Sequence, residues 1–196
     1  MYDTGMAIRR PAPIMTRVDH GLTIDDWFTL PDDGNQYELF EGVLCLMAPP
    51  SRRHQDITLD IATHLRAEAR RTGGYAGVAP LGVAMEERLG FLPDVVYVAP
   101  GREAILSDRG IEGIPDIVVE VLSRSTEAFD RGTKLRTYLR RGVREVWLVD
   151  PRRQTVTVHR SPRERTEAAF GQPIPSLLVN IGDAGLGQYA ANEPRP

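Results

Sequence analysis

The sequence predicts a mixed α/β fold in which helices cover a core β-sheet. Short apolar runs, several of which alternate with polar residues, are typical of strands. Two longer segments carry apolar residues at three- and four-residue spacing, which is typical of amphipathic helices. The expected order is strands, a long helix, three strands, a second helix and two strands. A chain of 196 residues with 41% hydrophobic content is long enough to enclose one core.

The first third of the chain predicts a capped helix, a hairpin and a long helix. Thr23 is placed to cap a short helix with an acidic first turn. Residues 36–47 alternate roughly between apolar and polar side chains around Gly42, which predicts a hairpin. A long helix is expected from Ser51 until Arg71, before the pair Gly73-Gly74. Its inward-facing side chains are expected to be His54, Ile57, Ile61, Leu65 and Glu68.

The rest of the chain predicts strands with one helix among them. In chain order we expect strands at 75–85, 91–99 and 114–123, with a polar connection at 101–113 before the last of these. A helix over about 127–141, capped by Ser125 or Thr126 and ended by Gly142, precedes strands at 144–150 and 154–160. This division predicts an N-terminal arm at 1–22, a single domain at 23–182 and a C-terminal tail at 183–196.

Composition favours a cytoplasmic protein without a membrane segment. No apolar run approaches the roughly 20 residues of a membrane helix, and the first residues lack the apolar core of a signal peptide. The single cysteine, Cys45, excludes an internal disulfide and a cysteine-based zinc site. No glycine-rich phosphate loop is present, which argues against a hydrolase of small phosphorylated molecules.

Charge is unevenly distributed along the chain. Residues 19–60 include nine acidic and two basic residues, whereas residues 131–165 include eleven basic and three acidic residues. This separation could divide metal binding from phosphate binding, or it could reflect solvated surfaces. Of the 24 basic residues all but Lys134 are arginine, which suggests that a lysine is needed there for a chemical reason.

Two strands carry carboxylates in similar Pro-Asp contexts. Asp94 precedes the run VVYV, and Asp116 and Glu120 lie in IPDIVVEVLS. If the two strands are neighbours, Asp94 and Glu120 converge, and a hard cation such as Mg²⁺ or Mn²⁺ would relieve their repulsion. Asp116 is about 13 Å from Glu120 along a strand, so we expect it to cap the start of the strand instead.

Structural explanations remain open for the same residues. Glu120 could form a buried ion pair with Arg144 or Arg136. Lys134 could be a surface lysine at the edge of its helix, with only its stem against apolar neighbours. His54 could be a hydrogen-bonded core histidine.

Several stretches together resemble the Uma family of endonucleases, within the PD-(D/E)xK superfamily of restriction-endonuclease-like folds. The resemblance covers about residues 23–160. The matching stretches, in order, are YELFEG, His54, PDVVYV, PDIVVEVLSRST, DRGTKLRTYLRRGV and EVWLVDP. The superfamily lysine two positions after the second acid is replaced by Leu122, and the resemblance implies that Lys134 on the following helix takes its place.

The resemblance implies a restriction-endonuclease-like mixed sheet flanked by helices, and hydrolysis of phosphodiester bonds in nucleic acid, expected to be DNA, with Mg²⁺ or Mn²⁺. The ion would be held by Asp94, Glu120 and the backbone carbonyl of Val121. Lys134 and Glu38 would complete the catalytic set, with His54 auxiliary. The arginines expected to contact nucleic acid are Arg131, Arg136, Arg140 and Arg141. By analogy alone, such an enzyme is compatible with a homodimer.

Two other interpretations remain open. A degenerate member of the family would bind nucleic acid or a protein partner without cleaving anything. A structural protein would use strand 144–150 as an interface, although the position of this strand in the family pattern favours the core.

Overall fold

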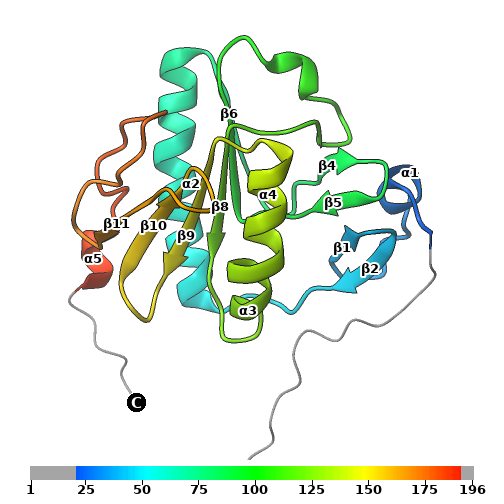
Figure 1. The fold of residues 1–196 in the computed structure, drawn as a ribbon, viewed down its shortest axis with the longest axis horizontal. Coiled ribbons are helices and arrows are strands. Elements are labelled where there is room, and N and C mark those ends of the chain that lie inside the picture. The colour runs from blue at the N-terminus through cyan, green and yellow to red at the C-terminus, as the bar shows by residue number, and fades with distance from the viewer. Residues whose placement is uncertain (1–20, 191–196) are drawn as a thin grey trace, which may run out of the picture.

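The strands form two sheets in a computed structural model that describes residues 21–190 (Figure 1). The six-stranded sheet has the order β11-β10-β9-β8-β6-β3, and the five-stranded sheet has the order β2-β1-β5-β4-β7. Only the pairs β8–β9 and β4–β7 are parallel among the described strands. The predicted mixed α/β class is confirmed, with the strands divided between two sheets where one core sheet was expected. The predicted arm at 1–22 lies outside the described residues except for 21 and 22.

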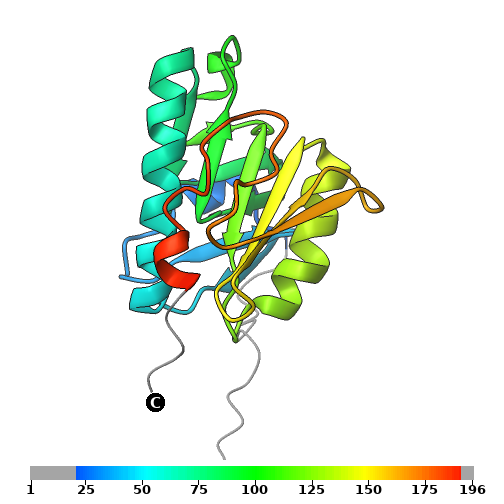
Figure 2. The same ribbon diagram turned by 90° about the vertical axis from the view of Figure 1, so that its left-hand side faces the viewer.

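The helices cover both faces of the six-stranded sheet. The view in Figure 2 places α2 and α4 on opposite sides of this sheet. Ile57, Ile61 and Leu65 of α2 pack into the core on one face, as the three-and-four spacing predicted. Tyr138 of α4 packs into the core on the other face, which the five-stranded sheet also closes. Glu68, the last member of the predicted stripe, instead pairs with Arg71 at 2.7 Å.

The predicted caps and turns of the first third are confirmed. The Thr23 side chain accepts from the amide of Asp26, and Ser51 caps α2 in the same way through the amide of His54. The hairpin turns at Glu41 and Gly42, both at positive φ, which suits the twist of its strands. The bounds of this part are α1 Ile24–Phe28, β1 Tyr37–Phe40, β2 Val43–Leu46 and α2 Arg52–Thr72.

Two predicted strands are each divided in the structure. Residues 75–85 form β3 Tyr75–Val78 and β4 Val83–Glu86, which belong to different sheets. Pro80 lies between them, and a proline has no amide to continue a strand ladder. In the same way Pro93 separates β5 Leu89–Phe91 from β6 Val95–Val98. The connection over 101–113 contains a short 3₁₀ turn, η1 Glu103–Ile105, and β7 Ile111–Glu112.

The second half follows the predicted order with two differences. The helix expected over 127–141 is α3 Glu127–Phe129, a π-helical turn η2 Asp130–Lys134, and α4 Leu135–Arg141. A strand that was not predicted, β11 Arg165–Ala169, pairs with β10; its side chains are mostly exposed and polar, so it carries no hydrophobic signal. The remaining bounds are β8 Ile117–Val121, β9 Glu145–Asp150, β10 Thr155–His159 and α5 Gly187–Ala190.

The described chain continues past the predicted domain boundary at 182. Ala184 and Leu186 are buried in the core on the α2 face, and Tyr189 of α5 is hydrogen-bonded to Asp60 of α2. Among residues 21–190, no helix has the length and apolar character needed to cross a bilayer.

Candidate active site

The strands next to Asp94 and around Glu120 are neighbours, which is the condition under which the sequence predicted that the two residues converge. β6 pairs with β8 in antiparallel register, with Val95 facing Val119. The next position of this register sets Asp94, just before β6, against Glu120 on β8. Asp94 Oδ2 also accepts the backbone amide of Val121 at 2.7 Å. Both residues therefore lie where β6 begins and β8 ends.

Lys134 reaches back to these strands from the helix. Its Nζ lies 2.7 Å from Oε1 of Glu38 and 3.2 Å from Oε1 of Glu120. The lysine side chain is only 2% exposed, so it is not the surface lysine that remained an alternative. Glu120 has this lysine as its cationic partner, and the predicted alternative of Arg144 or Arg136 is wrong. Arg144 pairs with Asp116 instead.

The π-helical turn η2 brings one acidic and one basic side chain into the site. Asp130 and Lys134 are its first and last residues, both buried, with Oδ1 and Nζ 3.8 Å apart. A π turn widens the helix and is often found at functional sites. Tyr138, one turn further on, donates its hydroxyl to Glu120 Oε1 at 2.6 Å. The helix therefore presents three polar side chains to the sheet.

Glu38 comes from the other sheet. It lies on β1, is fully buried, and its Oε1 accepts the amide of Leu92 at 3.1 Å besides the lysine. Because β1 pairs with β5, this contact ties the five-stranded sheet to the segment that carries Asp94. Glu38 Oε2 is buried and has no hydrogen-bond partner within the described part of the chain.

His54 contacts Asp94 from the first turn of α2. Its Nε2 lies 2.8 Å from Asp94 Oδ1, so both oxygens of Asp94 have protein partners. The other ring nitrogen, Nδ1, is buried and has no partner among residues 21–190. His54 is thus hydrogen-bonded and mostly buried, and its partner is a carboxylate of the candidate site.

Negative charge exceeds positive charge among these buried groups. Burial raises the pKa of Glu120 well above its usual value; Lys134 opposes this shift, and Asp130 and Asp94 add to it. Burial alone would lower the pKa of Lys134, but Glu120, Glu38 and Asp130 outweigh it and hold that pKa well above 10.5. Lys134 therefore stays protonated. Its single positive charge does not balance the buried carboxylates around it.

We expect stability to fall as pH rises through the range in which Asp130 titrates. Burial raises the pKa of Asp130 from 3.8 to about 6, against the opposing effect of Lys134. The folded state then binds a proton more tightly than the unfolded state, so ionisation costs stability between these values, by up to about 3 kcal/mol above pH 6.

Asp130→Asn should remove this part of the pH dependence. Urea unfolding between pH 4 and 8 measures it, and the variant should gain stability relative to the wild type at pH 8. Asp150→Asn is the matched control, because a lowered pKa gives Asp150 the opposite sign. Parallel stability curves for the wild type and Asp130→Asn would contradict the prediction.

Asp116 caps the start of β8, apart from the site. It accepts the amide of Ala99 at 2.8 Å and pairs with Arg102 at 2.9 Å and Arg144 at 3.3 Å. Its own carbonyl accepts the amides of residues 144 and 145. The side chain and the carbonyl of Asp116 therefore link the start of β8 to the end of β6 and the start of β9.

The four arginines expected to contact nucleic acid differ in their surroundings. Arg131 pairs with Glu127 and Asp150, and Arg141 pairs with Glu86 at 2.7 Å. Arg136 and Arg140 are exposed on α4, and neither has an ion pair within residues 21–190.

Sequence reasoning missed Asp130 and Tyr138. The one available signal was the four-residue spacing of Asp130, Lys134 and Tyr138, which on a regular helix sets all three on one face.

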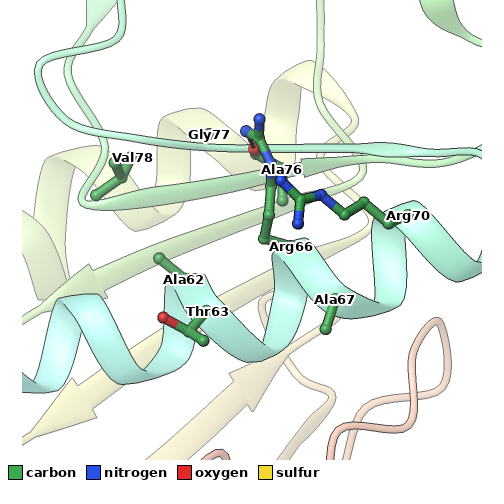
Figure 3. A pocket seen from close by; sticks show the side chains of 8 residues that line it. All are labelled: Ala62, Thr63, Arg66, Ala67, Arg70, Ala76, Gly77 and Val78. Carbon is green, nitrogen blue, oxygen red and sulfur yellow. Dashed lines mark hydrogen bonds between the residues drawn. The ribbon is translucent and has the colours of Figure 1, made fainter.

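A surface groove lies away from these residues. It has a volume of about 440 Å³ and runs between α2 and the edge strand β3 (Figure 3). Its lining is largely apolar, with Arg66 and Arg70 at its margin, and includes none of the candidate site residues.

Comparison with known proteins agrees with this fold. A solved structure described as "a putative nuclease belonging to DUF820", from Anabaena variabilis ATCC 29413, has a similar fold, with a TM-score of 0.70 and 19% sequence identity. The similarity covers 87% of this chain and 99% of that chain, and at this identity it concerns the fold alone. No curated protein matches the sequence. The model of the Uma2 family, described as "Putative restriction endonuclease", matches residues 24–182, and the chain therefore belongs to the Uma2 family.

Proposed function

We propose that this protein is a metal-dependent endonuclease that hydrolyses phosphodiester bonds of DNA. The observation that supports the proposal is the buried contact of Lys134 with Glu120, which lies next to Asp94 in the register of β6 and β8. Membership of a nuclease family supports the reaction class.

The donor chemistry of the site fits Mg²⁺ or Mn²⁺. Among residues 21–190, no three His, Cys, Asp or Glu side chains form a cage for an ion. Mg²⁺ is often held by one or two carboxylates, with water and substrate phosphate completing its shell. Asp94, Glu120 and the carbonyl of Val121 would supply such a set. Burial, with a smaller effect of the neighbouring carboxylates, raises the pKa of Glu120, so a cation at this site would stabilise its ionised form.

When bound, the ion would supply Lewis acidity at the scissile phosphate and a more acidic water. Lys134 remains charged, so its role is to stabilise negative charge developing on phosphate oxygens rather than to remove a proton. Glu38 holds the lysine in place through Oε1, and its Oε2, which has no hydrogen-bond partner among residues 21–190, is proposed to orient a water or a second ion. His54 fixes Asp94 as an auxiliary residue.

The proposal is tested by incubating the purified chain with supercoiled plasmid, single-stranded DNA and RNA, each with Mg²⁺, Mn²⁺ or EDTA. We expect cleavage of DNA with either ion and none with EDTA. Binding of DNA without cleavage under any ion would support the degenerate family member instead. Light scattering on the same preparation tests the homodimer inferred by analogy.

Arg136 and Arg140 are proposed to bind the phosphate backbone, because they are exposed and neither forms an ion pair within residues 21–190. Replacing both by alanine should weaken DNA binding. It should also make the dependence of log K on log salt shallower, by about 1 for each phosphate that no longer has a cationic partner. Fluorescence anisotropy over a salt range from about 50 to about 300 mM measures both quantities.

The matched control is Arg163→Ala, which removes an exposed arginine from the turn between β10 and β11. It should leave the salt slope unchanged. Equal slopes for the double variant and this control would show that α4 does not face the DNA.

A further inference from the structure

Tyr138 is the closest hydrogen-bond donor to the second carboxylate of the site. Its hydroxyl lies 2.6 Å from Glu120 Oε1, whereas Lys134 Nζ lies 3.2 Å from the same oxygen. The lysine is nearer to Glu38, at 2.7 Å. Glu120 is therefore oriented mainly by the tyrosine, and the lysine mainly by Glu38.

The tyrosine ring has little freedom to move. Tyr138 is fully buried, and its ring packs edge-to-face on Phe91 with centroids 5.1 Å apart. The Phe91 ring centroid in turn lies 5.7 Å from Lys134 Nζ. A hydroxyl on a ring held in this way keeps a fixed position relative to β8, which is what an orienting group requires.

We propose that Tyr138 is a positioning residue that holds Glu120 through Oε1, the oxygen that also contacts Lys134, so that Oε2 is left to bind the proposed metal ion. The inference rests on the proposed function, because it assigns a partner to a proposed metal ligand. Without the hydroxyl, Glu120 can turn towards Lys134, so that the ion loses a fixed oxygen. Loss of a hydrogen bond to a metal ligand typically weakens metal affinity or activity by about 10–100-fold.

Tyr138→Phe removes one oxygen and keeps the packing on Phe91. Binding of Mn²⁺, followed by electron paramagnetic resonance, should weaken by about 10-fold or more in this variant. The Mn²⁺ concentration that half-saturates DNA cleavage should rise by the same factor, while KM for DNA stays unchanged. The matched control is Tyr97→Phe, a buried tyrosine of β6 whose hydroxyl lies 3.4 Å from Thr72 on the α2 side. It should bind Mn²⁺ like the wild type.

A second pair of variants separates orientation from a loss of stability. In a Glu120→Gln background the Tyr138→Phe change should weaken Mn²⁺ binding no further, because the oriented carboxylate is already absent. Wild-type Mn²⁺ affinity in folded Tyr138→Phe would overturn the positioning role and leave the proposed nuclease intact. A wild-type protein that neither binds Mn²⁺ nor cuts DNA would overturn both.

Discussion

Glu120→Gln is expected to lower DNA cleavage by about 10³-fold or more without destabilising the protein. Glutamine keeps the shape of the side chain and still accepts from Tyr138, but it removes the negative charge proposed to hold the ion. Burial raises the pKa of Glu120, so its ionised form costs folding free energy above that pKa. The neutral variant should therefore be as stable as the wild type at pH 8, or more stable.

Such a result would show that Glu120 is needed for cleavage and not for the stability of the fold. Single-turnover cleavage and urea unfolding of the same preparation measure the two effects. Asp94→Asn should reduce cleavage to a similar extent. The matched control is Glu145→Gln on the adjacent strand β9, a buried carboxylate that binds Trp147, Ser176 and Arg160. It should lose stability and keep its cleavage rate per folded molecule. Full activity in Glu120→Gln would remove this residue from the site.

Lys134→Met is expected to abolish cleavage and also to destabilise the fold, by about 3–5 kcal/mol. Methionine fills the space, but Glu38 and Glu120 then remain buried without a cation. Because the pKa of Lys134 is raised, its stabilising charge is fully present below the ordinary lysine pKa of 10.5 and is lost only as pH rises through the raised value. The destabilisation should therefore be the same at pH 7 and pH 9.

Two further variants test the origin of this effect. Adding Glu38→Gln and Glu120→Gln to Lys134→Met should restore most of the stability and none of the cleavage, because both carboxylates that paired with the lysine are then neutral. Lys134→Arg keeps the charge in a larger planar group, so retained cleavage would show that charge alone is needed. A Lys134→Met protein as stable as the wild type would contradict the buried ion pairs.

The sequence predicted candidate residues for the site but few of the contacts between them. Asp94, Glu120 and Lys134 could be found because Pro-Asp before an apolar strand, a carboxylate inside a buried run and a sole lysine are all unusual in composition or position. The strands next to Asp94 and around Glu120 could be expected to pair, since strands that are close in the sequence are often neighbours, and Lys134 lies on the helix that follows. Helix caps at Thr23 and Ser51 were equally local, because each depends on a side chain and an amide three residues away.

Only the tertiary structure decided which groups pair with which. Glu38 meets Lys134 across a long stretch of sequence, and that contact exists because a second sheet packs against the first. The division into two sheets arises where Pro80 and Pro93 interrupt the ladders, and the π turn that buries Asp130 depends on how the helix packs. Local sequence patterns determine helix caps and the spacing of apolar side chains, and they reveal residues in unusual positions. Ion-pair partners and pKa shifts depend instead on burial by segments that are distant in the sequence.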